Sequence, residues 1–215
     1  DLHIHTLLSP CAEAEMTPRN ILKRAIRQKI DAIAITDHNS TGNVRSVVEA
    51  AKDTSLLVIP GVEIQTREEV HILGLFKDLP DVQNREDYFG SQILVDFNDN
   101  RVGEEKRLLL NSTRLSVDDA FALIAECRGL GICAHVDRPS YSIIGQLGFI
   151  PSGLPVAAVE VSHRISIREA VAEHSCLSNY PVISSSDAHR LSEIGKGCTT
   201  LSPRHAFWHA FTSNL

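Results

Sequence analysis

The sequence predicts an α/β barrel, and three observations lead to this fold class. Apolar, β-branched runs alternate with helical segments and are joined by short links, as in parallel βαβ units. The 215 residues suffice for one such domain, and a hydrophobic content of 43% allows a full core. Several apolar runs also end in a histidine or a carboxylate, and barrels carry their chemistry at the strand ends of one rim. We therefore expect a single domain over residues 1–215.

The first third of the chain contains regular strand and helix signals. Residues 2–6 alternate as a short strand, and Thr17-Pro18 is typical of an N-cap followed by proline in the first helical turn. Apolar residues at helical spacing extend that helix to Ile30. We expect a second helix at 43–52 and further strands at 31–36, 56–59, 62–66 and 70–76, of which the last two form a pair.

Residues 77–114 interrupt this alternation. A run at 93–97, an Asn98-Asp99-Asn100 turn and a second run at 107–110 predict a β-hairpin insertion on the barrel rim. Insertions of this kind often cover the site of a barrel. Beyond it we expect a helix at 116–127 with Ser116 as N-cap, strands at 132–135, 156–161 and 182–184, and a helix at 166–175.

Composition narrows the class of partners and the compartment. The net charge is −6, so we expect no overall electrostatic attraction to nucleic acid or to anionic membranes. No apolar run approaches the roughly 18 residues of a membrane span, and no signal-peptide pattern is present. The 5 cysteines are odd in number and form no C-x-x-C pair, which is typical of a reducing compartment. We therefore expect a soluble cytoplasmic protein.

Histidines and carboxylates gather at the predicted strand ends. His3 and His5 project to the same side of one strand, because side chains alternate with period two, and two such imidazoles can clamp one cation. The other candidates each lie at the end or the start of an apolar run: His38, Glu63, His71, His135, Asp187 and His189. Each alone has a structural explanation, but their recurrence at consecutive strand ends indicates a metal cluster.

Glu63 carries particular weight among these candidates. It follows an apolar strand and the Pro60-Gly61 pair, so we expect it to be buried. A buried carboxylate needs a compensating charge, which a metal ion supplies. A carboxylate that bridges two cations is the natural use of such a glutamate.

Six sequence blocks (DLHIHT, AITDHN, PGVEI, HILGLF, AHVDR and SSDAH) resemble those of the PHP (polymerase and histidinol phosphatase) family of metal-dependent phosphoesterases. The blocks occur in the family's order, from Asp1 to about Lys196. The resemblance implies a distorted (β/α)7, TIM-like barrel with a trinuclear metal centre at the C-terminal ends of its strands. It implies a first metal held by His3, His5, Glu63 and Asp187, a second held by Glu63, His71 and His135, and a third held by His38, His189 and position 11.

Position 11 departs from many members of the family, which carry histidine or aspartate there. A thiolate at Cys11 suits zinc or iron(II) and is a poor ligand for magnesium or manganese. Two interpretations stay open. Either Cys11 completes the third site, or it is a small buried residue beside a weak or empty site, with Glu13 and Glu15 as substitute ligands. We expect two or three divalent ions per chain, with zinc, iron and manganese as the candidates.

Arg138 follows His135 by three residues, as in the A-H-x-x-R pattern of the family. A guanidinium binds phosphate oxygens bidentately, so we assign Arg138 to the substrate phosphate. The alternative is an ion pair with Asp137 or another carboxylate. Arg190 and Lys196 could add positive charge near the last loop.

Polar residues beside the cluster are expected to act indirectly. We expect Asp1 and Asp37 to accept hydrogen bonds from histidine rings rather than to bind metal. His163 follows a strand but is more simply explained as a structural residue. His205 and His209 are expected on the surface or in helices.

These residues lead to a hypothesis of hydrolysis: a phosphomonoester or a small phosphodiester is cleaved by metal-activated water. Arg138 and the cations would offset charge on the phosphoryl oxygens. A water on the third metal, Asp187 or His189 would protonate the leaving alkoxide. The expected partner is a small phosphorylated substrate, and no membrane is involved.

Three alternatives stay open. The first is an exonuclease, for which nucleic acid would be a partner only as a short oligonucleotide substrate. The second is a non-catalytic metal-binding PHP module. The third is another metal-dependent hydrolysis, such as cleavage of an amide or a lactone, with no role for Arg138. The near-complete ligand set argues against the second.

Overall fold

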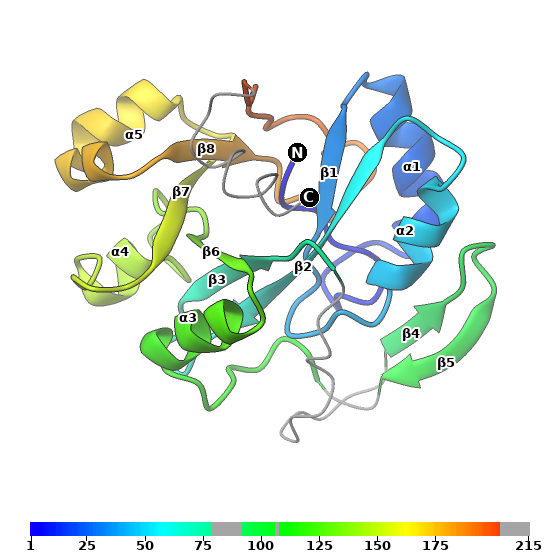
Figure 1. Cartoon of the computed structure of the whole chain (residues 1–215), viewed down its shortest axis with the longest axis horizontal. Helices are drawn as coiled ribbons and strands as arrows, with labels where there is room; N and C mark the ends of the chain where they lie inside the picture. The colour runs from blue at the N-terminus through cyan, green and yellow to red at the C-terminus, as the bar shows by residue number, and fades with distance from the viewer. Residues whose placement is uncertain (79–91, 106–107, 203–215) are drawn as a thin grey trace.

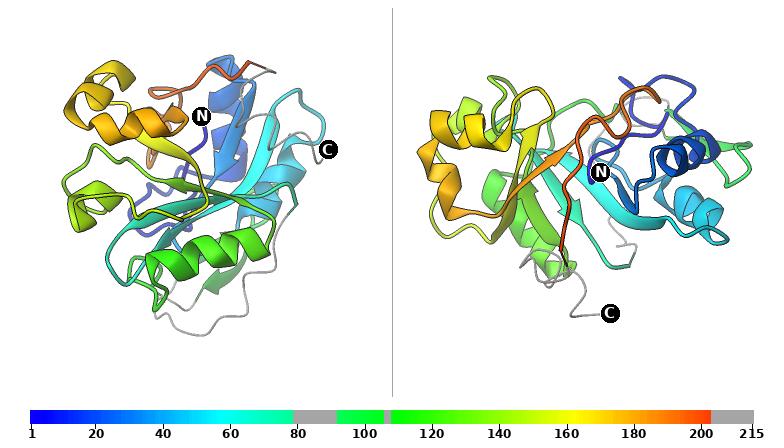
Figure 2. Two further views of the ribbon diagram at one scale, coloured as in Figure 1. Left: turned by 60° about the vertical axis from the view of Figure 1, so that its left-hand side comes forward. Right: turned by 90° about the horizontal axis from the view of Figure 1, so that it is seen from above.

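A six-stranded sheet of the order β1-β2-β3-β6-β7-β8 forms the centre of the molecule (Figure 1). The computed structural model describes residues 1–78, 92–105 and 108–202. The strands of this sheet are β1 (Ala32–Ile35), β2 (Leu57–Gln65), β3 (His71–Leu75), β6 (Leu130–Cys133), β7 (Val156–Ser162) and β8 (Val182–Ser185). The helices are α1 (Pro18–Arg27), α2 (Val44–Ala51), α3 (Val117–Glu126), α4 (Ile143–Leu147), α5 (Ile167–Glu173) and the 3-10 helix η1 (Ser175–Asn179). The expected α/β class is confirmed, with the sheet curled into a half-barrel (Figure 2).

The N-terminal segment lies between the two edges of this sheet. Ile4 forms isolated parallel bridges with Ile35 at the end of β1 and with Ala188 beyond β8. His5 N donates to Ala188 O at 3.0 Å, and Thr36 N donates to Ile4 O at 2.9 Å. The expected strand at 2–6 is therefore reduced to a bridge, but this bridge connects the first and last strands and closes the rim.

The expected pair of strands at 62–66 and 70–76 is confirmed as β2 and β3, and here the sheet departs from the parallel arrangement of βαβ units. β3 pairs antiparallel with both β2 and β6, whereas β1–β2, β6–β7 and β7–β8 are parallel. β2 also runs unbroken through Pro60-Gly61, where the sequence predicted an end. Its first half pairs with β1 and its second half with β3. A Cβ on Gly61 would lie 2.8 Å from Thr36 Cγ2, so this close approach to β1 requires glycine.

Apolar side chains pack on both faces of the curled sheet. Between the sheet and α1 and α2 lies one cluster, and between the sheet and α3 and α5 lies another. A third cluster fills the inside of the curl: Leu2, Ala34, Ile59, Leu73, Leu75, Ile132, Ala134, Ala158 and Ile183. Helices therefore cover the outer face, and the inner face forms a separate core.

The helix signals in the sequence are confirmed with small differences. Ser116 caps α3 in a reciprocal capping box with Asp119, and Ser166 caps α5 in the same way with Glu169. Thr17 precedes α1 but makes no side-chain cap. Its hydroxyl instead donates to Asp99 Oδ2 at 2.9 Å, which ties α1 to the turn of the inserted hairpin.

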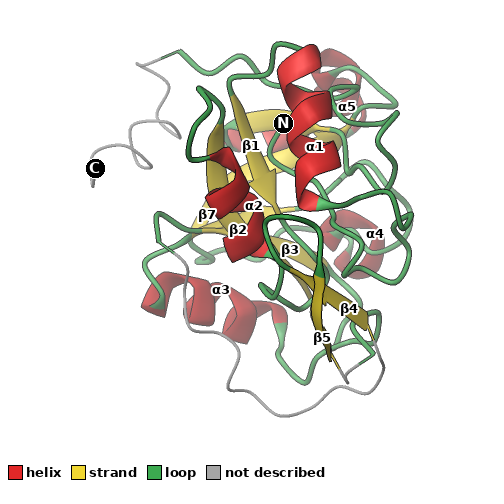
Figure 3. Cartoon of the chain, turned by 90° about the vertical axis from the view of Figure 1, so that its right-hand side faces the viewer, coloured by secondary structure: helices red, strands yellow, loops and turns green. Residues whose placement is uncertain are grey.

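The predicted hairpin is present, but its second strand lies elsewhere. β4 (Gln92–Val95) pairs with β5 (Arg101–Glu105), and Figure 3 shows this hairpin apart from the main sheet. The leucines at 108–110 predict the second strand at 107–110, whereas β5 lies at Arg101–Glu105. β5 is instead a polar strand with an exposed edge. Residues 79–91 and 106–107 of the predicted insertion lie outside the described residues.

Among the helices that the structure describes, none is long and apolar enough to cross a bilayer. His205 and His209 lie outside the described residues. That residues 1–215 form one domain stays a prediction.

Candidate metal centre

The site lies where the inner face of the sheet passes from apolar to polar residues. Period two places His71 on the same side of β3 as Leu73 of the inner core, and Glu160 on the same side of β7 as Ala158. Glu63 continues the inner positions of β2 in the same way. The apolar inside of the half-barrel therefore ends in a rim of ionisable side chains.

The N-terminal segment brings two imidazoles to the centre of this rim. The Nε2 atoms of His3 and His5 lie 3.1 Å apart. Asp187 Oδ1 lies 3.2 Å from His3 Nε2 and 3.1 Å from His5 Nε2. Glu63 places Oε1 3.3 Å from His3 Nε2 and Oε2 3.4 Å from His5 Nε2. Two imidazole nitrogens and two carboxylates thus surround one point in a buried environment.

Hydrogen bonds on the far side of each ring determine which nitrogen carries the proton. His3 Nδ1 lies 3.0 Å from Glu160 Oε1, and a carboxylate accepts, so Nδ1 donates. His5 Nδ1 lies 2.9 Å from Ser9 Oγ, whose own proton goes to Asp37 Oδ1 at 2.7 Å, so His5 Nδ1 also donates. The two Nε2 lone pairs therefore face each other, and this arrangement requires a cation or a proton between them.

The electrostatics of the cluster favour a positive charge at the same point. Although burial opposes its protonation, Glu160 and Asp187 raise the pKa of His3 well above its usual value. Burial and the neighbouring imidazoles hold the pKa of His5 well below its usual value. The carboxylates thus attract one positive charge, which a divalent cation satisfies better than a single proton.

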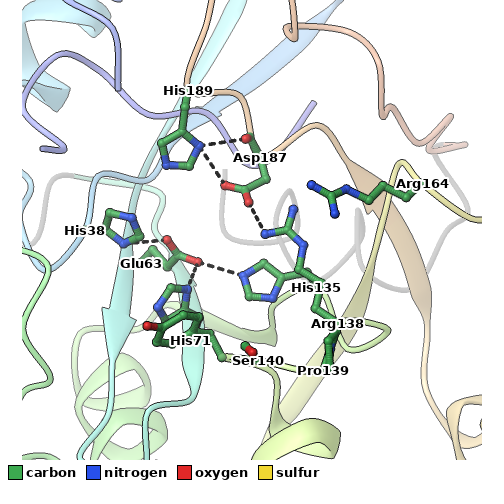
Figure 4. A pocket seen from close by; sticks show the side chains of 11 residues that line it. His38, Glu63, His71, His135, Arg138, Pro139, Ser140, Arg164, Asp187 and His189 are labelled. Atoms are coloured by element: carbon green, nitrogen blue, oxygen red, sulfur yellow. Dashed lines mark hydrogen bonds and ion pairs between the residues drawn. The ribbon is translucent and has the colours of Figure 1, made fainter. Parts of the chain in front are cut away.

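Glu63 lies at the centre of the cluster, and Figure 4 shows the imidazole rings of His38, His71 and His135 around it. His38 Nδ1 lies 2.9 Å from its Oε2, His71 Nδ1 lies 2.8 Å from its Oε1, and His135 Nε2 lies 3.3 Å from its Oε1. Burial opposes ionisation of this carboxylate, but the surrounding imidazoles, His71 first, lower its pKa well below the usual range. Glu63 therefore stays ionised although it is buried.

Several buried polar atoms around Glu63 have no hydrogen-bond partner among the described residues. These atoms are His38 Nδ1, Glu63 Oε2, His71 Nδ1 and His135 Nδ1. The contacts of His38 and His71 with Glu63 are short but lack hydrogen-bond geometry. Orphaned buried polar atoms are costly. Ligand atoms of His38, Glu63 and His71 lie within 4.8 Å of one another, as a bound metal ion requires, whereas His135 turns its Nε2 rather than its unpartnered Nδ1 towards Glu63. The residues present therefore fit a metal centre.

Among the described residues, three groups of side chains could each hold a metal ion, because the ligand atoms within each group lie within 4.8 Å of one another. The groups are His3, His5 and Glu63; His38, Glu63 and His71; and His5, His38 and His189. The first group lies within the first expected ligand set. The second shares Glu63 and His71 with the second set. The third contains His5 where the sequence led us to expect Cys11. The division of ligands among individual ions stays a prediction.

Cys11 lies at the outer edge of the cluster. It is a free, exposed cysteine. Desolvation of the sulfur opposes ionisation, but the imidazoles of His189 and His38 lower the pKa of Cys11 to about 7. Cys11 is exposed rather than a small buried residue, and whether it completes the third site stays a prediction.

Arg138 closes the rim on the side of the loop after β6. Its Nη1 donates to Asp187 Oδ2 at 2.6 Å, whereas Asp137 accepts from the backbone and the hydroxyl of Ser162. Arg138 and Asp187 line a cavity of about 220 Å³ over the cluster. Arg138 Nε is buried without a hydrogen-bond partner among the described residues. The alternative of an ion pair with another carboxylate is therefore present, and a role of Arg138 towards a phosphate stays a prediction.

Backbone strain coincides with the site. His135 has a φ of 30° and Asp187 a φ of 51°, and Asn39, directly after His38, has a φ of 48°. L side chains rarely adopt this left-handed region, and its cost is met only where the surrounding structure holds the backbone. Asn39 N donates to Glu63 O at 2.8 Å, which holds the loop after β1 against β2.

Sequence reasoning missed two residues that position the cluster. Glu160 is fully buried and contacts His3, and its Oε1 also accepts from His135 N at 3.2 Å. Ser9 is fully buried and contacts His5. A glutamate inside the apolar run of β7 was the available signal for Glu160. No sequence pattern marks Ser9, because its role depends on how the loop folds.

The prediction that Asp1 and Asp37 accept hydrogen bonds from histidine rings is wrong. Asp1 accepts from the backbone of Ser186 and Gly195, and so holds the last loop. Asp37 accepts from Thr6 and Ser9, and so acts on a histidine only through the Ser9 hydroxyl.

Other candidates lie outside the cluster. Arg190 Nε pairs with Glu13 Oε1 at 3.2 Å, and both side chains are exposed. The cavity lining among the described residues includes neither Lys196 nor Glu15. His163 Nδ1 hydrogen-bonds to the carbonyl of Ser186 at 3.1 Å, which is the structural role expected for it.

Known proteins resemble this chain in sequence over about a third of its length. The 5′-3′ exoribonuclease Rnm of Salmonella typhimurium is 37% identical over 84 residues, which are 37% of this chain and 28% of that protein. The 3′,5′-nucleoside bisphosphate phosphatase of Chromobacterium violaceum is 33% identical over 78 residues, which are 35% of this chain and 26% of that protein. The aligned part thus spans less than a third of the length of these relatives.

A solved structure resembles the whole described fold. An amidohydrolase from Chromobacterium violaceum, solved with bound sulfate and no metal, has a TM-score of 0.64 at 20% identity and covers 94% of this chain and 92% of that one. At that identity the likeness establishes the fold alone. The PHP domain family matches residues 1–142. Since this match spans more than half of its residues and includes most of the cluster, the chain belongs to the PHP domain family.

Proposed function

We propose that this protein is a metal-dependent phosphoesterase that hydrolyses a phosphomonoester or a small phosphodiester. One observation carries the proposal: buried imidazoles and carboxylates with unpartnered ligand atoms meet on one rim, and a guanidinium with an unused donor faces them. The names of the relatives support the reaction class, since they include an exoribonuclease and a nucleoside bisphosphate phosphatase.

The proposed metal ligands are the residues whose side chains converge on the rim: His3, His5, Cys11, His38, Glu63, His71, His135, Asp187 and His189. They would hold two or three ions. Imidazole and thiolate ligands favour zinc or iron, and the carboxylates also accommodate manganese. Such ions, when bound, supply Lewis-acid chemistry that activates water and offsets phosphoryl charge.

The protein's own residues would bind and orient the phosphate. Arg138 can donate from its free Nε to a phosphoryl oxygen, while its Nη1 stays with Asp187. Burial opposes ionisation of Asp187, but the charge of His3 lowers its pKa well below the usual value, so Asp187 stays ionised. The proton for the leaving oxygen would therefore come from His189, in a state in which its ring does not hold a metal. Desolvation opposes protonation of His189, but hydrogen bonding to Cys11 and the charge of Asp187 raise its pKa, which favours it as the proton donor.

A reconstitution assay tests this function. The metal-free protein would be loaded separately with zinc, iron(II) or manganese and assayed with p-nitrophenyl phosphate, an aryl carboxylic ester and a lactone. We expect phosphate release that chelation abolishes and at least one of the ions restores. Hydrolysis of the ester or lactone without phosphate release, or no hydrolysis with any ion, would contradict the proposal.

A 5′-3′ exonuclease acting on short oligonucleotides is the second candidate, and the 37% identity to exoribonuclease Rnm favours it. Cleavage that depends on oligonucleotide length and falls with salt would support it. We also propose a cytoplasmic location, because all 5 cysteines are free.

A further inference from the structure

We propose that Arg164 recognises a second phosphate group of the substrate, beside the phosphate that is hydrolysed. The inference rests on the proposed phosphoesterase function and assigns a specificity-determining role to a residue outside the metal cluster. It is carried by the shape of the cavity, the charges in its lining and the way the loop after β7 is held.

The cavity over the cluster is too small for a whole nucleotide-sized substrate. Its volume is about 220 Å³, below the range of roughly 300–1,000 Å³ typical of ligand pockets. Its lining combines residues of the metal cluster with Arg138, Tyr141 and Arg164, and the ring of Tyr141 stacks on that of His71 with centroids 4.9 Å apart. Arg164 and Tyr141 are exposed, so they lie at the mouth of the cavity. The enclosed part therefore fits a phosphoryl group, and the rest of the substrate must extend past Arg164.

Two guanidinium groups line this cavity, and the described residues pair only one of them. Arg138 donates to Asp187, whereas the side chain of Arg164 has no hydrogen bond or ion pair within the described ranges. Figure 4 shows the guanidinium of Arg164 turned towards that of Arg138. Two like charges that face each other repel, and an anion bound beside them relieves this repulsion. The charge of Arg138 is therefore balanced by Asp187, and Arg164 adds a second positive charge that can bind a further anionic group of the substrate.

The backbone around Arg164 is held in place by the same loops that carry Arg138. Arg164 N donates to Ser162 Oγ at 3.3 Å, and Ser162 Oγ donates to Asp137 Oδ2 at 2.6 Å. The neighbouring His163 hydrogen-bonds to the carbonyl of Ser186, one residue before Asp187. The backbone at Arg164 is thus fixed relative to both partners of the Arg138–Asp187 pair. Such preorganisation lowers the entropic cost of binding an anion.

The chemistry of the ligand follows from these observations. A guanidinium beside an anion-binding site recognises phosphate, with which it forms paired, charge-assisted hydrogen bonds. The second phosphate could belong to a free bisphosphorylated nucleoside or to the neighbouring nucleotide of an oligonucleotide. Both sources present the same group, and the experiment separates them.

The test compares substrates with one and two phosphates on wild type, Arg164→Ala and Arg168→Ala. Arg168 is exposed on α5 outside the cavity lining, so its variant removes the same charge without touching the site. The substrates are adenosine 3′,5′-bisphosphate, each adenosine monophosphate, and a tetra-adenylate with and without its 5′-phosphate. The readout is the ratio of kcat/KM with the second phosphate to kcat/KM without it.

We expect wild type and Arg168→Ala to show the same high kcat/KM ratio with either the adenosine phosphates or the tetra-adenylates. The substrate series that shows the high ratio identifies whether the second phosphate belongs to a free nucleoside bisphosphate or to an oligonucleotide. In Arg164→Ala that ratio should fall about 10- to 100-fold through KM, as for the loss of one charge-assisted contact. An unchanged ratio in Arg164→Ala, or an equal loss with one-phosphate and two-phosphate substrates, would overturn the inference. If wild type hydrolyses no phosphate ester, the proposed function itself fails.

Discussion

The inner and outer halves of the candidate metal centre differ in how firmly the fold holds their ligands. His3, His5 and Glu63, which form the inner half, are no more than 1% exposed. The outer half contains Cys11, an exposed residue, and His189, whose side chain is 22% exposed. One half is therefore part of the core, and the other lies at the surface.

The difference extends to the hydrogen bonds behind the ligands. Glu160 holds the ring of His3, and Ser9 holds the ring of His5. Within the described part of the chain, the ring of His189 is held through Nδ1 by the backbone carbonyl of Asp187, two residues away in the same loop. Fixed rings set the tautomer and the direction of the lone pair before a metal binds. We expect the inner half to bind metal more tightly and the outer half to respond more to solution conditions.

The largest effect is expected from Glu63→Gln. The amide cannot supply the negative charge that the inner half is built around, so activity on an aryl phosphate should fall by roughly three orders of magnitude. Metal content, measured by plasma mass spectrometry, should fall with it. Glu126→Gln, an exposed change at the end of α3, is the matched control and should retain both. Full metal content in Glu63→Gln would contradict the role of Glu63 as the carboxylate on which metal binding by the inner half depends.

A smaller effect is expected from Glu160→Ala. The variant removes the acceptor that fixes His3 without removing a proposed ligand, and such losses typically cost about 10- to 100-fold in metal affinity. The measurement is a competition titration against a chelating dye, with circular dichroism to verify the fold. A titration identical to that of wild type would mean that Glu160 does not position His3.

Ser9→Ala should cost less, about 10-fold in metal affinity. His5 would lose the acceptor for its Nδ1 proton, so the tautomer with a free Nε2 would no longer be favoured. The same dye titration measures this loss. Ser9→Thr, which keeps the hydroxyl, should recover part of it, and equal losses in both variants would point to packing instead.

The smallest effect on activity is expected from Cys11→Ser, a few-fold change confined to the outer half. The stronger signature is pH dependence. Because hydrogen bonding to His189 and His38 lowers the pKa of Cys11 to about 7, the thiolate predominates above pH 7 and is lost as the pH falls below it. Alkylation of Cys11 in the metal-free protein, followed by peptide mass spectrometry, should therefore reach half its maximal rate near pH 7. A midpoint near pH 9, the ordinary pKa of a cysteine, would show that Cys11 is not a thiolate at neutral pH. Added zinc should slow the alkylation, because a bound ion would protect the sulfur.

Much of the fold could be predicted because its signals are local. Ser116 and the acids that follow it fix the start of α3, and the β-branched runs fix most strands. The pairing of β3 with β2 could be predicted, because the two strands follow each other in the sequence. The pairing of β3 with β6 could not, because β6 lies far along the chain, beyond the inserted hairpin. Pro60-Gly61 suggested a strand end but instead lies where β2 passes from β1 to β3.

The residues of the candidate site also differ in whether the sequence alone could identify them. Histidines and carboxylates at strand ends could be found from spacing alone, since period two and the common rim bring them together. The residues behind them could not. Ser9 acts through a loop that returns to His5, and Arg164 has no motif of its own, so both depend on tertiary contacts between distant segments.

The central claim is that this rim binds divalent cations in ordered positions. The most direct measurement is the anomalous scattering of crystals of the manganese- or zinc-reconstituted protein, recorded at the absorption edge of the ion. The account predicts two or three peaks, one of them between His3, His5, Glu63 and Asp187. No peak within the cluster, or ions bound only at surface carboxylates, would contradict it.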